Sequence, residues 1–137
     1  MTARAALANR RRTSVDDMSE PAKPVGPYTP IVRAGDWLVV SGQVGIADGQ
    51  IVTGGTAAEL RQAIANLEAQ LASEGAELGD VVKTTVFLRH MSDYAAMNEV
   101  YIECFGDHRP ARSAIGVAEL PLGALVEVEA WAHVGGG

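Results

Sequence analysis

The sequence has little of what marks several protein classes. Its single cysteine, Cys104, allows no disulfide within the chain, so a reducing cytoplasmic location is expected. No apolar run approaches the roughly 18 residues of a membrane-spanning helix. No signal-peptide pattern appears either. The three histidines are scattered without the spacing of metal ligands, so no metal site is expected.

Positive charge is also scarce. The chain has 11 Lys and Arg against 17 Asp and Glu, a net charge of −6. An Arg-rich start, residues 1–17, carries a balance of +2, which leaves −8 on residues 18–137. An acidic body disfavours nucleic acid, whose affinity comes largely from phosphate neutralisation. Any anion-binding site must therefore be local, and each arginine in the body is a candidate.

What remains is typical of one globular domain. The chain has 137 residues, of which 47% are apolar, enough for a single core. Residues 1–20 have no apolar periodicity that continues into the body, and we expect them to be a flexible extension. Met18 is an alternative start of translation, and the role of residues 1–17 stays open. Residues 21–137 form the expected domain.

Periodicity predicts an α+β fold with a single mixed sheet of about six strands and two helices on one face. The first helix runs from Thr56, with Glu59 completing a capping box, to Gly75. The second begins at Ser92 or Asp93 and stops at Gly106. The expected strands are Ile31–Arg33, Trp37–Gln43, Gln50–Val52, Val81–Arg89, Arg112–Val117 and Leu125–Val134.

Strand alternation assigns side chains to the two faces of this sheet. In the last strand the small and β-branched residues face the helices, and Glu127, Glu129 and Trp131 face away. The same reasoning places bulky residues in the core, namely Val44, Ile115 and Val117. It leaves Arg112, Ala114, Gly116, Ser41 and Gln43 on the helix-free face with Glu127. Ala114 and Gly116 would leave room for a small ligand beside Arg112.

The helix-free face is too apolar for simple exposure to solvent. Its expected members include Trp37, Val39, Phe87, Leu125 and Trp131. An apolar patch mixed with polar groups usually marks an interface. We therefore expect an oligomer whose subunits meet through this face, with sites near the seams.

Six segments resemble motifs of the RidA (YjgF, L-PSP) family, in order and with suitable spacing over about residues 24–134. They are Gly26–Pro30 (G-P-Y-S), Ser41–Gln43 (S-G-Q), Val81–Leu88 (V-V-K-T-T-V-F-L), Asn98–Tyr101 with Phe105 (N-x-x-Y-x-x-x-F), Pro110–Ser113 (P-A-R-S), and Leu120-Pro121 with Val126–Ala130 (L-P…V-E-I-E-A).

The resemblance implies a chorismate-mutase-like RidA fold, a homotrimer with sites between subunits, and no cofactor. It implies hydrolysis of enamines and imines, such as 2-aminoacrylate and 2-iminopropanoate, to a 2-oxo acid and ammonia. Arg112 would clamp the substrate carboxylate, because a guanidinium binds a carboxylate bidentately. Glu127 would position the water. Tyr28 would cover the site and donate a hydrogen bond or a proton, and the alternative that it only anchors its loop by packing stays open. The other expected ligand contacts are Ser41, Gly42, Phe87, Asn98 and Ala114.

Several alternatives stay open. Glu129 competes with Glu127 for the water, and Arg112 could instead form a structural ion pair with Glu127. Ala114 replaces a cysteine that is frequent in the family. Thr29, Gly116 and a short stretch between residues 105 and 112 also depart from the family pattern. The substrate, the subfamily and the enzyme that supplies the imine therefore stay open. A non-catalytic module for small carboxylates or proteins and an endoribonuclease are the competing functions.

Overall fold

The computed structural model describes residues 24–135, so the expected extension 1–20 lies outside the described residues. Within residues 24–135, nine main elements follow one another. They are β1 (Ile31–Ala34), β2 (Trp37–Val44), β3 (Ile46–Ala47), β4 (Gln50–Ile51), α2 (Gly55–Ser73), β5 (Val81–Leu88), α3 (Tyr94–Phe105), β6 (Ala111–Gly116) and β7 (Val126–His133). Short 3₁₀ turns occur at Leu78–Asp80 (η2), Met91–Asp93 (η3) and Pro121–Gly123 (η4).

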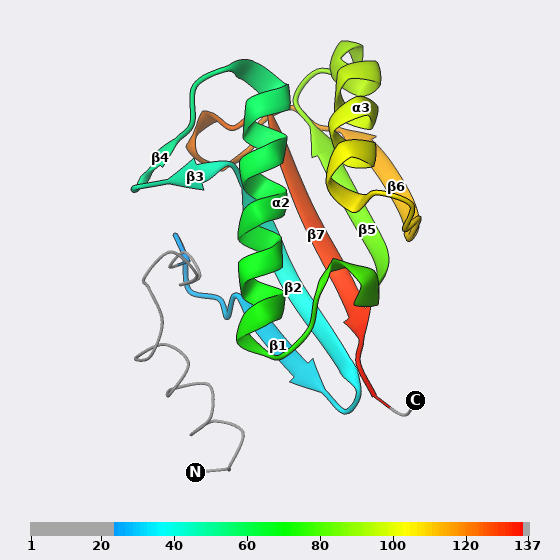
Figure 1. Ribbon diagram of the computed structural model, residues 1–137. Coiled ribbons are helices and arrows are strands. Elements are labelled where there is room, and N and C mark those ends of the chain that lie inside the picture. Colours follow the sequence, from blue (N-terminus) through cyan, green and yellow to red (C-terminus); the bar gives the residue numbers. More distant parts are fainter. Residues whose placement is uncertain (1–23, 136–137) are drawn as a thin grey trace.

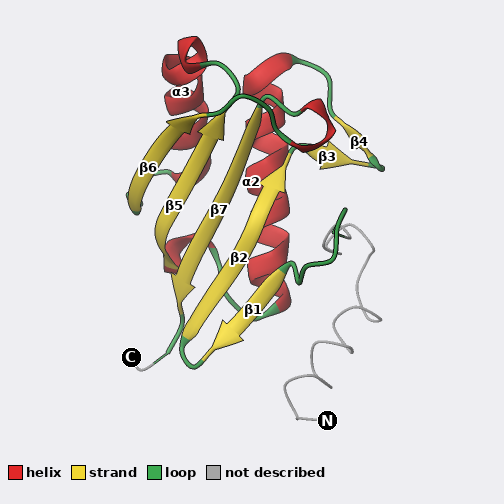
Figure 2. Cartoon of the chain, turned by 180° about the vertical axis from the view of Figure 1, so that it is seen from behind, coloured by secondary structure: helices red, strands yellow, loops and turns green. Residues whose placement is uncertain are grey.

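The strands form a five-stranded sheet in the order β1-β2-β7-β5-β6. The β5–β6 pair is parallel, joined through α3, and the other pairs are antiparallel. Both helices cover one face, and no helix among residues 24–135 covers the strands on the other, which is called the bare face below (Figures 1 and 2). The α+β class, the mixed sheet and the placement of the helices are thus confirmed. The sheet has five strands, and Gln50–Val52, expected as a further strand of it, instead pairs as β4 with β3 in a separate hairpin.

The core lies between this sheet and the helices. The predicted stripe of α2 is fully buried, with Leu60, Leu67 and Leu71 at 0% exposure. The helix-facing residues of β7, from Val126 to Ala132, are also at 0%, as their alternation predicts. Burial of this apolar area is the main stabilising term of the fold.

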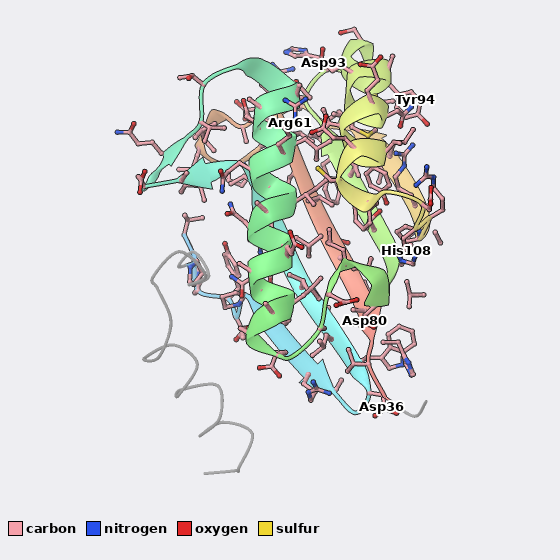
Figure 3. The ribbon with its side chains drawn as sticks, in the orientation of Figure 1. Asp36, Arg61, Asp80, Asp93, Tyr94 and His108 are labelled. Carbon is pink, nitrogen blue, oxygen red and sulfur yellow. The ribbon has the colours of Figure 1, made fainter. Side chains whose placement is uncertain are left out.

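The predicted capping box at the start of α2 is wrong. The helix begins at Gly55 after an N-cap Gly54 with φ of 119°, and no side chain caps it. The Thr56 hydroxyl instead donates to the Asp93 carboxylate at 2.6 Å, at the top of α3 (Figure 3). The Glu59 carboxylate accepts the Leu125 N–H at 2.8 Å. Both side chains therefore connect α2 to other elements rather than to its own first turn.

Candidate functional site

A bulge in β2 shapes the bare face of the sheet. Val40 pairs with Ala130 and Gln43 with Val128, so two residues of β2, Ser41 and Gly42, stand opposite the single intervening residue of β7. A bulge of this kind inverts the alternation beyond it. Gln43 consequently faces the helix side, where it is 8% exposed, and Val44 lies beside Glu127. The predicted faces of Gln43 and Val44 are therefore wrong.

The end of β2 is fixed from the helix side. The buried Asn66 amide of α2 donates to the carbonyls of Val44 and Ile46, at 3.0 and 2.9 Å. These bonds give buried backbone carbonyls a partner. They tie the end of β2 and the start of β3 to α2, and with them the position of Val44.

Gly42 allows the Glu127 carboxyl to lie directly on the backbone of β2. A Cβ at position 42 would fall 2.7 Å from Cδ of Glu127 and 2.8 Å from its Oε2. Any larger residue would displace the carboxyl. The bulge and Gly42 together therefore set the position of Glu127.

An open cleft surrounds this carboxyl. Its empty space, including the part open to solvent, is about 790 Å³. The lining residues are Val25, Tyr28, Ser41, Gly42, Val44, Phe87, Pro121, Glu127 and Glu129. Five of the predicted site residues meet here, namely Tyr28, Ser41, Gly42, Phe87 and Glu127. The sequence patterns did not predict Val25, Val44 or Pro121 at this site. Gly42 was an available signal for Val44, because a glycine inside a strand often marks a bulge, and this bulge turns Val44 toward the cleft.

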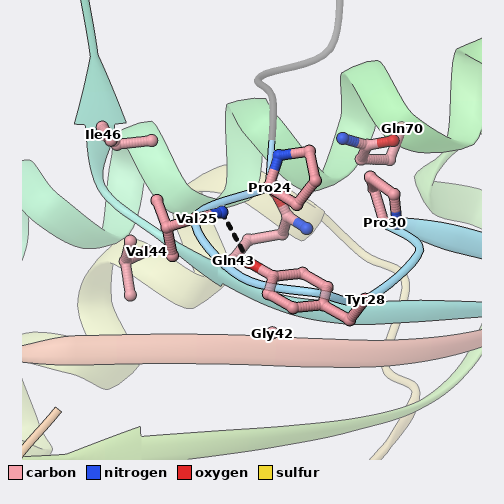
Figure 4. A pocket seen from close by; sticks show the side chains of 9 residues that line it. All are labelled: Pro24, Val25, Tyr28, Pro30, Gly42, Gln43, Val44, Ile46 and Gln70. Carbon is pink, nitrogen blue, oxygen red and sulfur yellow. Dashed lines mark hydrogen bonds between the residues drawn. The ribbon is translucent and has the colours of Figure 1, made fainter. Parts of the chain in front are cut away.

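The proline-rich segment 24–30 forms one rim of the cleft. The Ser41 hydroxyl donates to the Thr29 carbonyl at 2.7 Å, and the Ser41 N–H donates to the Pro30 carbonyl at 2.9 Å. The Tyr28 hydroxyl accepts the Val25 N–H at 3.3 Å. Behind this rim a smaller pocket reaches Gln43 and Gln70 (Figure 4). Ser41 thus anchors the segment that carries Tyr28.

The electrostatics of the cleft single out Glu127. Burial raises the pKa of its carboxyl, and the negative charge of Glu129 raises it further. A carboxyl whose pKa is raised by desolvation holds a proton more readily, and can accept and return one during a reaction. No cation lines the cleft of the single chain.

Arg112 lies on the opposite face, which corrects the prediction. It pairs with Thr84, whose side chain is in the core, and its guanidinium stacks 4.8 Å from the Tyr101 ring centroid. It also donates to the Tyr94 hydroxyl at 3.1 Å, on the β6 side of α3 (Figure 3). Cation–π stacking on α3 explains the reversal. A structural Arg112–Glu127 ion pair within one chain is therefore excluded.

The other residues predicted with Arg112 follow it to the helix side. Ala114 pairs with the buried Val86 and packs against the core, and a Cβ on Gly116 would meet Met91 of η3 at 2.8 Å. The small size of Ala114 and Gly116 therefore allows close packing on the helix side and does not make room for a ligand. Ile115 instead faces outward at 45% exposure, which corrects its assignment to the core. Asn98, on α3, is not among the residues of the cleft.

Residues 24–135 offer neither a cluster of metal ligands nor a membrane-spanning helix. No group of three or more His, Cys, Asp or Glu side chains within 24–135 could hold a metal ion. None of the helices described is long and apolar enough to cross a membrane.

Comparison with known proteins agrees with this architecture. A RutC family protein of Pyrococcus horikoshii is 45% identical over 113 residues, 81% of this chain and 90% of its own length. The mouse protein named 2-iminobutanoate/2-iminopropanoate deaminase is 43% identical over 81% of this chain and 84% of its own.

Solved structures give the same result. Escherichia coli TdcF with bound serine superimposes with a TM-score of 0.80 at 32% identity, covering 88% of this chain and 98% of TdcF. RidA from an Antarctic Psychrobacter also gives 0.80, at 34% identity, with 88% and 98% covered. The family model described as Endoribonuclease L-PSP matches residues 18–134. The chain therefore belongs to the RidA/YjgF family, also called the endoribonuclease L-PSP family.

Proposed function

We propose that this protein hydrolyses small enamines and imines, such as 2-aminoacrylate and 2-iminopropanoate, to a 2-oxo acid and ammonia. The observation that carries the proposal is the Glu127 carboxyl, half-buried on Gly42 in a cleft, with a raised pKa. Relatives of 42–43% identity named 2-iminobutanoate/2-iminopropanoate deaminase support the same reaction. The location of the protein in the reducing cytoplasm remains a prediction from the sequence.

Glu127 has the properties that the chemistry requires. Its carboxylate accepts a proton from water as the water oxygen bonds to the carbon of the protonated imine, which gives a neutral carbinolamine. Glu127 returns that proton to the nitrogen. The carboxylate then accepts the carbinolamine hydroxyl proton as the C=O bond forms and the C–N bond breaks, so that ammonia leaves and the 2-oxo acid remains. An enamine first takes a proton on its terminal carbon. The Tyr28 hydroxyl accepts one hydrogen bond from Val25, so its own proton is available to donate.

Recognition of the substrate carboxylate needs a cation that the cleft of one chain lacks. Among the described residues, no carboxylate lies within ion-pair distance of Arg112. Arg112 also lies on β6, an edge strand of the sheet. In the proposed homotrimer, Arg112 of one subunit meets the Glu127 cleft of the next and clamps the substrate there.

The bare face of the sheet supports this assembly. Four large apolar side chains on it are exposed between 39% and 48%, namely Val32, Trp37, Ile115 and Trp131. Monomeric proteins seldom leave such a patch in water. Ser41, Gly42 and Phe87 would contact the substrate from the Glu127 side, and Asn98 and Ala114 could do so only from the subunit that supplies Arg112.

The proposed function is tested by letting the protein compete with semicarbazide for an imine that is formed in situ. An amino-acid oxidase generates imines in the presence of semicarbazide, and the protein should divert them from semicarbazone to free 2-oxo acid. Arg112→Ala and Glu127→Gln should both lose this activity. A folded oligomer that is inactive with every precursor would contradict the proposal. Retained ligand binding would then favour a binding module, and Arg112-dependent RNA cleavage would favour an endoribonuclease.

A further inference from the structure

Glu129 is a second carboxylate in the cleft, without a partner among the described residues. It lies on β7 two positions from Glu127, on the same face, about 7 Å along the strand. No described hydrogen bond or ion pair involves its side chain, and its charge acts on Glu127. A buried structural role would require such a partner, so its carboxylate is available to act on a ligand.

The remaining walls of the cleft are largely apolar. They are formed by Val25, Val44, Phe87 and Pro121, from four different segments of the chain. These four side chains stabilise an aliphatic substrate side chain through burial and offer no hydrogen-bond donor to an acidic one. Of the two hydroxyls in the cleft, that of Ser41 donates to the Thr29 carbonyl, and that of Tyr28 is assigned to the reacting carbon. Both the walls and Glu129 therefore disfavour negative charge.

We propose that Glu129 is a charge selector, which restricts the cleft to 2-imino acids with neutral, apolar side chains and excludes those with acidic side chains. This inference rests on the proposed function. With the substrate's own carboxylate on Arg112 and its imine carbon at Glu127, the side chain is left to face the rest of the cleft. Specificity then comes from repulsion of the wrong substrate as well as from contact with the right one.

The size of the effect follows from Coulomb's law. An acidic substrate side chain held about 7 Å from the Glu129 carboxylate in a partly exposed cleft should be disfavoured by about tenfold. The measurable quantity is a ratio: kcat/KM with the leucine-derived imine divided by kcat/KM with the glutamate-derived imine. An amino-acid oxidase supplies the first imine, and D-aspartate oxidase acting on D-glutamate supplies the second.

The variants are Glu129→Gln, which removes the charge, and Glu129→Asp, which keeps it. Glu68→Gln is the matched control, because it makes the same change at an exposed position on α2. We expect a ratio of about ten or more in the wild type, Glu129→Asp and Glu68→Gln, and a fall of about tenfold in Glu129→Gln alone. The proposal that Glu129 selects against charge is overturned by either of two results. One is an unchanged ratio in Glu129→Gln, and the other is an equal fall of the ratio in Glu68→Gln.

The affinity for the 2-oxo acid product tests the role of Glu129 independently of the proposed reaction. Titration calorimetry with 4-methyl-2-oxopentanoate and with 2-oxoglutarate needs no turnover. The wild type should bind the first more tightly by about tenfold, and Glu129→Gln should lose the difference. Selective binding without turnover would contradict the deaminase and keep the selector. Turnover with equal affinity for both acids would contradict the selector and keep the deaminase.

Discussion

The Arg112 guanidinium and the Glu127 carboxyl lie on opposite faces of the same five-stranded sheet. Arg112 stacks on Tyr101 beneath α3, whereas Glu127 lies on Gly42 in the cleft of the bare face. One chain therefore cannot bring both groups to one small substrate. Either the reaction uses two subunits, or one of the two residues has another role.

Gly42→Ala should impair catalysis more than stability. The new Cβ would lie 2.7 Å from Cδ of Glu127, at the movable end of a side chain, so the carboxyl shifts and the backbone stays. We expect kcat to fall by at least about tenfold, since a misplacement of about 1 Å can cost a hundredfold. Steady-state kinetics and the melting temperature check this.

Gly79→Ala is the matched control. A Cβ there meets only Oε1 of Glu77, at an ordinary 3.6 Å. Its kinetics should match those of the wild type. Equal kinetics for Gly42→Ala and the wild type would show that the position of the Glu127 carboxyl does not limit the reaction.

Glu127→Gln should stabilise the protein at neutral pH. Burial and the Glu129 charge raise the pKa of Glu127 in the folded state, so the folded chain holds this proton more tightly than the unfolded chain. The corresponding stability is present below the unfolded pKa and is lost as pH rises through the folded pKa. Glu127→Gln has no carboxyl to ionise at this position, so the variant does not lose this stability as the pH rises.

Thermal melts at two pH values measure this effect. We expect the melting temperature of Glu127→Gln to exceed that of the wild type by about 3 °C at pH 7.5 and to match it near pH 4. A lower melting temperature at pH 7.5 would mean that the charged carboxylate stabilises the fold.

Tyr94→Phe should weaken substrate binding and leave the chemical step intact. It removes the hydroxyl that accepts from Arg112 and keeps the ring under the guanidinium, 5.6 Å from the centroid. Loss of one hydrogen bond to a charged group should raise KM by about three- to tenfold. Tyr28→Phe, on the other side of the sheet, should lower kcat instead. A fall in kcat for Tyr94→Phe would contradict its role in positioning Arg112.

Trp131→Glu should disrupt the proposed homotrimer. Trp131 is 46% exposed on the bare face, at an edge-to-face distance of 6.2 Å from Trp37. A charge buried at a subunit interface costs several kcal/mol, of order 3–5. Sedimentation should show smaller species with a folded circular dichroism spectrum. An unchanged mass would exclude this surface as the interface.

The sequence predicts those parts of the fold that obey regular periodicity. The alternation of β7 correctly separates the core residues from Glu127 and Glu129, and the apolar stripe of α2 is buried as expected. Alternation fails at β2, because the bulge at Ser41 and Gly42 shifts its register. Such a shift depends on strand pairing, which local patterns do not specify.

Alternation also fails at β6, for a different reason. The rule assumes that apolar side chains face the helices, but β6 is an edge strand whose helix side is occupied by a stacked arginine. Ile115 accordingly faces the bare surface. Where both faces are covered, one by helices and one by the proposed neighbouring subunit, hydrophobicity no longer identifies the core.

Mixed oligomers test the central claim most directly. Arg112→Ala and Glu127→Gln, each inactive alone, would be co-expressed with different tags and isolated as hetero-oligomers. If Arg112 of one subunit serves the Glu127 cleft of the next, every mixed trimer, whichever variant it holds twice, has one of its three sites with both residues intact, and about a third of wild-type activity should return. Mixed oligomers that stay inactive would contradict the account, because both residues would then have to act within one chain.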